Sequence, residues 1–297
     1  GNRWKIMYKI NDLELGIYEK ALPKDKSWKE RLEIAKEAGY SFVEISVDET
    51  DERLARLDWN EEERREFREA VAQTGIRVPS MCLSGHRRFP LGSENPETRA
   101  KAFEIMKSGI ELAVDLGIRT IQLAGYDVYY EEENERTREL FIDGMKKSCE
   151  WARKANVMLA MEIMDHPFMS SITKYLEYAE MINSPFFKVY PDLGNLSAWP
   201  ENDVEFELEK GINDIVAIHL KDTLAVTKDF PGKFKEVPFG EGCVNFPKLF
   251  KKLKELNYTG AFLIEMWTEK SDNPILEVKN AKKWMLERMK EGGYLGC

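Results

Sequence analysis

Four side chains that could bind a metal ion or transfer protons each lie at the end of a short apolar run. They occur in the strings LAMEIMD, VYPDLGN, VAIHLKD and FLIEMW, and they are Glu162, Asp192, His219 and Glu265. Three carboxylates and one imidazole form a mixed oxygen and nitrogen ligand set that is typical of a divalent-metal site. Two ionisable glutamates beside a metal could also move protons. These residue types together indicate an enzyme.

The spacing of these four residues predicts that they meet at one place. Successive members are 30, 27 and 46 residues apart, and each gap is long enough to hold one helix and its loops. In a strand–helix–strand chain the ends of successive parallel strands come together at one rim of a barrel. Buried acids of like charge repel one another unless a cation compensates them, so a shared metal explains the set better than four separate structural roles.

Apolar runs alternate with amphipathic stretches eight times along the chain. The runs are rich in Val, Ile, Leu, Phe and Met, as strands buried on both faces must be, and they are Leu13–Tyr18, Phe42–Val47, Val78–Leu83, Thr120–Ala124, Met158–Ile163, Lys188–Asp192, Val216–Leu220 and Ala261–Met266. Eight such units in 297 residues match a (β/α)8 TIM barrel. We therefore expect an α/β fold with one barrel domain that spans residues 1–297.

The stretches between these runs carry helix signals. Trp28–Ala38 has an apolar stripe at helical spacing, and Arg99–Leu116 is expected to be one long helix whose start is marked by a capping Asn95 and by Pro96. Glycines in the left-handed conformation are expected to end three helices, at Gly39, Gly75 and Gly117. Strand alternation puts each glutamate of the metal set on a face with apolar residues that would fill the barrel, which are Met158, Ala160, Ala261 and Leu263.

Composition limits the function classes. The formal charge is −9, from 53 acidic and 44 basic residues, and no basic tract is present, so we expect no nucleic-acid partner. No run of 18 apolar residues and no signal peptide are found, so we expect no membrane partner. The cysteines are far apart and are expected to be free thiols in a reducing cytoplasm, at Cys82, Cys149, Cys243 and Cys297.

A cluster of cationic and hydroxyl groups follows the third apolar run. In CLSGHRRFPLGS, the residues Ser84, His86, Arg87 and Arg88 could clamp an anion at the rim, since an arginine offers a bidentate fork to phosphate. The alternative is a solvated loop whose arginines pair with surface acids. A phosphorylated small molecule is therefore a candidate ligand.

Two further segments after the His219 run could contact a ligand. Gly240 and Gly242, in VPFGEGCVNF, would let backbone N–H groups approach a ligand closely, although the pattern is not that of a dinucleotide site. Lys221 is either a further charge for the substrate or a partner of Asp222. The stretch 222–236 is the least regular part of the second half, and it is a candidate lid or a solvent-exposed insertion.

Long strings of the chain closely resemble one enzyme family. The chain is similar to the L-xylulose-5-phosphate (L-ribulose-5-phosphate) 3-epimerases of anaerobic L-ascorbate utilisation, from about Leu15 to the last helix, in GIYEKALP, FVEISVDETDERLARLDW, RVPSMCLSGHRRFPLGS, IQLAGYDVYY, MEIMD, PDLGNLSAW and VPFGEG. More broadly it resembles the xylose-isomerase-like TIM barrels, which include the D-tagatose and D-psicose 3-epimerases. The resemblance implies that strands five to eight supply one metal site, and the matching positions are Glu162, Asp192, His219 and Glu265.

One departure from the family bears on the substrate. Epimerases of free ketohexoses generally carry a glutamate and a histidine for substrate hydroxyls where this chain has Phe168 and Asn195. The difference implies another substrate end and favours the phosphopentulose relatives. We therefore include Asn195 and Lys221 among the residues expected to bind a small phosphorylated ketose. Separately, we expect the enzyme to be a homodimer.

The chemistry expected is inversion at C3 of a 2-ketose. The proton at C3 is α to the C2 carbonyl, and a divalent ion that chelates O2 and O3 would stabilise the enediolate. Inversion needs a base on one face and an acid on the other, which Glu162 and Glu265 can supply. The ligand set suits Zn²⁺, Mn²⁺ or Co²⁺. Two alternatives remain open: an aldose–ketose isomerase such as a hexulose-6-phosphate isomerase, and a non-catalytic sugar-phosphate sensor.

Overall fold

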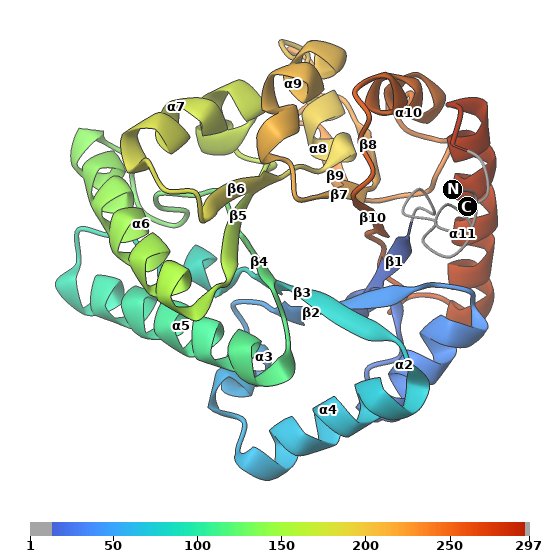
Figure 1. Ribbon diagram of the computed structural model, residues 1–297. Coiled ribbons are helices and arrows are strands. Elements are labelled where there is room, and N and C mark those ends of the chain that lie inside the picture. The colour runs from blue at the N-terminus through green and yellow to red at the C-terminus, as the bar shows by residue number, and fades with distance from the viewer. Residues whose placement is uncertain (1–13, 295–297) are drawn as a thin grey trace, which may run out of the picture.

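The computed structural model describes residues 14–294, which form a barrel of parallel strands ringed by helices (Figure 1). The barrel strands are β1 (Leu15–Tyr18), β2 (Phe42–Val47), β3 (Arg77–Leu83), β4 (Thr120–Leu123), β5 (Met158–Glu162), β6 (Phe187–Tyr190), β7 (Ala217–Leu220) and β10 (Ala261–Ile264). Their order in the sheet is β6-β5-β4-β3-β2-β1-β10-β7. Parallel bridges from Val189 to Ile215 and from Asp192 to His219 close the barrel between β6 and β7.

The eight predicted strands correspond to these eight strands, and the predicted (β/α)8 fold is confirmed. The bounds differ by a few residues, and Leu13, the predicted start of the first strand, lies outside the described residues, as does Cys297. Asp192 and Glu265, which the sequence placed inside strands, lie just beyond β6 and β10. These acids therefore stand on the rim itself.

The larger helices of the described residues surround the sheet. They are α2 (Trp28–Glu37), α4 (Glu61–Thr74), α5 (Pro96–Leu116), α6 (Glu135–Ala155), α7 (Ile172–Ile182), α9 (Val204–Gly211), α10 (Phe246–Glu255) and α11 (Pro274–Glu291). Short helical turns lie on the rim loops: α3 (Asp51–Leu54), α8 (Leu193–Ala198), η1 (Glu19–Ala21), η2 (Ala55–Asp58), η3 (Gly85–Arg87) and η4 (Pro167–Met169). A further turn, η5 (Ile212–Asp214), lies at the opposite end of the barrel, between α9 and β7. None of the helices described is both long and apolar enough to cross a membrane.

Helix ends follow the signals in the sequence. The Asn95 side chain accepts hydrogen bonds from two backbone N–H groups in the first turn of α5, so this helix begins at Pro96, earlier than the apolar run alone suggests. Gly75 and Gly117 end α4 and α5 with φ of 74° and 77°, and Gly39 follows α2 with φ of 90°. These left-handed positions are where glycine carries no steric cost.

The barrel interior holds both apolar and polar side chains. Two small apolar clusters lie apart from the main core between sheet and helices; one contains Ala160, Tyr190 and Ala217, and the other contains Leu263. Ala160 and Leu263 share faces with Glu162 and Glu265, as strand alternation predicts. The metal set therefore sits above a filled barrel.

The stretch 222–236 is more regular than the sequence predicts. It forms an antiparallel hairpin of β8 (Asp222–Leu224) and β9 (Lys233–Val237), which is a correction of the expected irregular loop. The Phe234 ring lies 5.5 Å from the Trp199 ring, so the hairpin is packed against the segment after β6. Its role as a lid stays a prediction.

Candidate metal centre and substrate cavity

The four predicted ligands come together at the carboxyl ends of four neighbouring strands. Glu162 is the last residue of β5, Asp192 caps the first turn of α8 after β6, His219 lies in β7, and Glu265 follows β10. One ligand atom from each of them lies within 4.8 Å of the others. Among the His, Cys, Asp and Glu side chains of residues 14–294, these four are close enough together to hold a metal ion.

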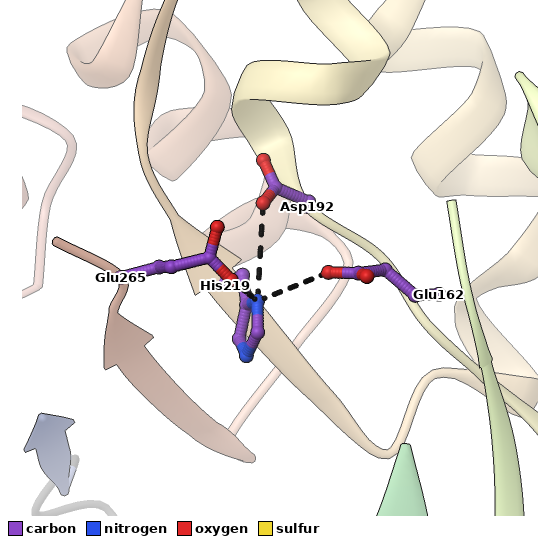
Figure 2. A group of neighbouring side chains, drawn as sticks. All are labelled: Glu162, Asp192, His219 and Glu265. Carbon is purple, nitrogen blue, oxygen red and sulfur yellow. Dashed lines mark ion pairs between the residues drawn. The ribbon is translucent and has the colours of Figure 1, made fainter. Parts of the chain in front are cut away.

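The carboxylates surround one nitrogen of the histidine. His219 Nδ1 lies 2.9 Å from Glu265 Oε2, 3.3 Å from Glu162 Oε2 and 3.8 Å from Asp192 Oδ2. Figure 2 shows Glu162 and Glu265 on opposite sides of the imidazole, with Asp192 between them. All four side chains are buried. The arrangement leaves the two glutamates facing each other across a common centre.

The residues present fit a divalent cation. Two buried ligand atoms, His219 Nδ1 and Asp192 Oδ2, make no hydrogen bond to another described residue. Three carboxylates this close repel one another, and a shared cation removes that cost. Three oxygen donors and one imidazole nitrogen suit a first-row transition ion or Zn²⁺, so we regard this cluster as a candidate metal centre.

The two glutamates have different electrostatic surroundings. Burial, together with the nearby Glu265 carboxylate, raises the pKa of Glu162 to about 7. Burial also acts to raise the pKa of Glu265, but Lys221 and His219 outweigh it and hold that pKa at about 2. For His219, burial alone would lower the pKa, and the carboxylates of Glu44 and Glu265 raise it well above its usual value instead.

Lys221 belongs to this cluster. Its Nζ lies 3.4 Å from Asp192 Oδ2 and 3.3 Å from Glu265 Oε1, so its partners are two metal-set acids and not Asp222, the partner that the sequence suggested. Lys221 is 6% exposed and still lines the cavity above the metal set. A buried ammonium in this place can partly neutralise the acids and also reach a ligand.

The backbone N–H groups of the glycine turn have another partner. Those of Gly240 and Gly242 each donate to Asp222 Oδ2 at 3.0 Å, and the N–H of Val244 donates to Oδ1 of the same carboxylate. A Cβ on Gly242 would meet Asp222 Oδ1 at 2.0 Å, so this close approach requires glycine. In this structure these N–H groups hold the turn onto β8, and their binding of a ligand stays a prediction.

A cavity of about 250 Å³ opens above the metal set. We call it the central cavity, and of the residues predicted to bind substrate it is lined by Ser84, Arg87, Asn195 and Lys221. Asn195 donates from Nδ2 to the Ile163 carbonyl, while its buried Oδ1 has no hydrogen-bond partner among the described residues. That oxygen has an unused acceptor position in a residue that lines the cavity.

Three consecutive basic side chains, two in the 3-10 turn η3 and one just after it, point in different directions. Arg87 lines the central cavity, where it donates to the Tyr126 hydroxyl at 2.9 Å. His86 is buried, with Nε2 at 3.0 Å from the Ala102 carbonyl, and Arg88 forms an ion pair with Asp51 at 2.7 Å. His86 and Arg88 do not line the cavity, so the predicted anion clamp is reduced to Ser84 and Arg87.

Several residues of the site were missed by sequence reasoning. The central cavity is also lined by Tyr18, Lys20, Lys235 and Trp267, and Glu44 reaches the metal set from inside the barrel. Glu44 had a recognisable signal, because it is an acid in the middle of the apolar run Phe42–Val47. A second cavity, of about 580 Å³, adjoins the central cavity and shares Lys221, Glu265 and Trp267 with it.

Known proteins resemble this chain over nearly its whole length. Residues 32–288 match the family model of the xylose isomerase-like TIM barrel. The chain is 57% identical over 283 residues to L-ribulose-5-phosphate 3-epimerase UlaE of Escherichia coli O157:H7, which covers 95% of this chain and 97% of the relative. A solved L-ribulose 3-epimerase has a TM-score of 0.74 at 17% identity, covering 94% of this chain and 95% of that one. A D-psicose 3-epimerase from Clostridium cellulolyticum H10 has a TM-score of 0.77 at 12% identity, covering 93% and 99%.

These matches establish the class and then the family. The matched family model and the barrel geometry define a xylose isomerase-like TIM barrel. Within that class the chain belongs to the family of L-ribulose-5-phosphate 3-epimerases, because more than half of the residues are identical over 95% of the chain. The two structural neighbours are too distant in sequence to support more than the fold. The resemblance found in the sequence is thus confirmed.

Proposed function

We propose that this protein is a metal-dependent 3-epimerase that interconverts L-ribulose 5-phosphate and L-xylulose 5-phosphate at C3. The observation that carries the proposal is the placement of Glu162 and Glu265 on opposite sides of one buried centre (Figure 2). Family membership supports the same activity, since the relative UlaE bears the name of an L-ribulose-5-phosphate 3-epimerase.

The two glutamates are the proposed acid and base. The hydrogen at C3 is acidic because it is α to the C2 carbonyl, and a group on each face of C3 can remove or return it. Glu162 and Glu265 come from β5 and from the end of β10, on either side of β6 and β7 in the closed barrel. A divalent ion held by Glu162, Asp192, His219 and Glu265 would polarise the carbonyl and neutralise the developing negative charge. Zn²⁺, Mn²⁺ and Co²⁺ are the candidates.

The cations of the central cavity support a phosphorylated substrate. Arg87 and Ser84 are the remaining members of the predicted anion clamp, and Lys20 and Lys235 line the same cavity. Arginine offers a bidentate fork that matches phosphate. We propose that Arg87 and Ser84 contact the phosphate, while Asn195 and Lys221 contact hydroxyl or carbonyl oxygens of the sugar.

The test is incubation of the metal-loaded protein with each pentulose 5-phosphate in D₂O. We expect both epimers to form and deuterium to appear at C3, as followed by NMR. Exchange at C1 with formation of an aldose would identify an isomerase instead, and binding without any exchange would identify a sensor. The matched control is His219→Ala, which removes one proposed ligand and is expected to lose both metal and exchange.

Two expectations concern the whole protein. We propose that it acts in the cytoplasm, because the three described cysteines are free thiols, which a reducing compartment preserves. We also propose that it is a homodimer, which sedimentation of the purified protein at several concentrations tests.

A further inference from the structure

A buried carboxylate inside the barrel contacts the metal set from below. Glu44, on β2, has no solvent exposure, and its Oε1 lies 2.8 Å from His219 Nε2. Its other oxygen, Oε2, accepts hydrogen bonds from the Ser80 hydroxyl at 2.6 Å and from the Tyr190 hydroxyl at 2.8 Å. Glu44 lines neither of the two cavities described above, so its contacts are with the protein and not with a ligand.

These contacts decide which nitrogen of His219 keeps its proton when a cation is bound. The Nε2 atom faces a carboxylate, which is only an acceptor when ionised, so Nε2 must be the donor. The Nδ1 atom faces three more carboxylates, and a cation bound among them requires Nδ1 to give up its proton and offer its lone pair. A ring with its proton on Nδ1 instead would turn an N–H toward the cation site and leave Glu44 without its donor.

The ring is held in this orientation on more than one side. Tyr190 lies edge-on against His219, with ring centroids 4.8 Å apart and planes at 69°, and the same Tyr190 donates its hydroxyl to Glu44. Glu44 therefore accepts from three donors and cannot shift toward one without losing another. A buried carboxylate with all its hydrogen-bond partners is held rigidly in place. Loss of one partner would leave a buried acceptor unsatisfied and would lower the stability of the folded protein.

We propose that Glu44 is a positioning residue of the metal centre, which holds the Nε2–H of His219 and thereby aims the Nδ1 lone pair at the metal. A carboxylate that fixes the tautomer and raises the basicity of a ligating histidine is a recurring device in metalloproteins. This inference rests on the proposed metal centre, but it concerns a residue that touches neither the metal nor the substrate. The experiments that test it therefore measure metal affinity first and epimerase activity second.

The direct test is the affinity of Glu44→Gln for Co²⁺ and Zn²⁺, measured by competition with a chelator. Glutamine has the same shape but no charge, and it can present an N–H to Nε2 and so favour the wrong tautomer. We expect affinity to fall by about 10–100-fold, the usual effect of losing such a support. The visible spectrum of the Co²⁺ protein should also change, because the donor strength of the imidazole changes. Unchanged affinity and spectrum would overturn the inference.

Ser80→Ala is the matched control. It removes one hydrogen bond from the same buried carboxylate but leaves the contact between Glu44 and His219 in place. We expect lower thermal stability with nearly unchanged metal affinity. If Ser80→Ala weakens metal binding as much as Glu44→Gln does, the effect is general damage to the interior and the positioning role is wrong.

A measurement on the unaltered protein decides the matter even if Glu44→Gln fails to fold. The chain has three histidines, so ¹H–¹⁵N spectra of the imidazoles can be assigned with His86→Gln and His166→Gln. In the Zn²⁺-loaded protein we expect His219 to carry its proton on Nε2, and a proton on Nδ1 would overturn the inference. If the unaltered protein binds no divalent metal, the proposed centre and this inference both fail. If it binds metal and epimerises while Glu44→Gln behaves identically, only this inference fails.

Discussion

Lys221 Nζ lies 3.3 Å from Oε1 of Glu265, on the side of that carboxylate away from the histidine contact made by Oε2. The ammonium helps to hold the pKa of Glu265 at about 2, whereas burial raises the pKa of Glu162 to about 7. Environments that push apart the pKa values of two neighbouring acids commonly separate an acid from a base. In the metal-free protein the two glutamates therefore differ in protonation near neutral pH, and both must be ionised when they bind a cation.

The first prediction concerns these two glutamates. Glu162→Gln and Glu265→Gln should each lower the rate of epimerisation by roughly 10²–10⁴-fold, the usual contribution of general acid–base catalysis. One of the variants should still exchange the C3 hydrogen of one epimer with solvent, because the base on that face remains. NMR in D₂O measures both processes.

Weaker metal binding could imitate this loss, so metal content must be measured in the same samples. A variant that is fully loaded with metal and inverts C3 at nearly the normal rate would show that its glutamate is not an acid or base of the reaction.

The second prediction is that metal affinity rises with pH. Glu162, with a pKa of about 7, and His219, whose pKa is raised well above its usual value, must both lose protons to bind a cation. Protons therefore compete with the metal at low pH. The affinity for Zn²⁺ should increase by about tenfold or more between pH 6 and pH 7. Chelator competition at several pH values measures the affinity, and calorimetry in two buffers of different ionisation enthalpy counts the protons released. A pH-independent affinity without proton release would mean that these two groups are not ligands.

Much of the site could be predicted because it depends on local sequence. The barrel strands are continuous apolar runs, and in a parallel barrel a polar residue at the end of such a run has only the rim to occupy. Glu162, Asp192, His219 and Glu265 were therefore found together without knowledge of any contact between them.

The remainder depends on contacts that a linear pattern does not encode. Glu44 and His219 are 175 residues apart and meet only through the curvature and register of the closed sheet. Arg87, the last residue of η3, and Arg88, the next residue, face different surroundings. The local backbone sets these directions, and two adjacent arginines in a sequence do not reveal them. The hairpin β8–β9 has short, mostly polar strands, which lack the apolar run that marks the barrel strands.

The third prediction separates the two neighbouring arginines. Arg87→Ala should raise KM for the phosphorylated ketose by about 10–100-fold, because hydrogen bonds to a charged group contribute about 1.5–3 kcal/mol. Arg88→Ala is the matched control, and it should leave KM nearly unchanged, because this side chain is paired with Asp51 away from the central cavity. Initial-rate measurements with a phosphorylated and a free pentulose compare the two variants. Equal effects of the two substitutions, or an equal effect of Arg87→Ala on both sugars, would contradict the proposed phosphate contact.

The last prediction is that His86 makes the fold sensitive to acid. Burial holds the pKa of His86 at about 4, below the usual value of 6.5. As pH falls through this interval the unfolded chain takes up a proton that the folded protein does not, so the free energy of unfolding decreases. The full difference corresponds to roughly 3 kcal/mol, and above pH 6.5 this contribution is constant.

Urea unfolding between pH 7 and pH 4, with chelator present to remove any bound metal, measures this dependence. His86→Gln keeps an N–H that can reach the Ala102 carbonyl but has no proton to gain, so its stability should decline less steeply below pH 6.5. His166→Gln is the control, because His166 is only partly buried and its substitution should change the slope less. If His86→Gln and the unaltered protein lose stability in parallel, His86 is not the source of the acid sensitivity.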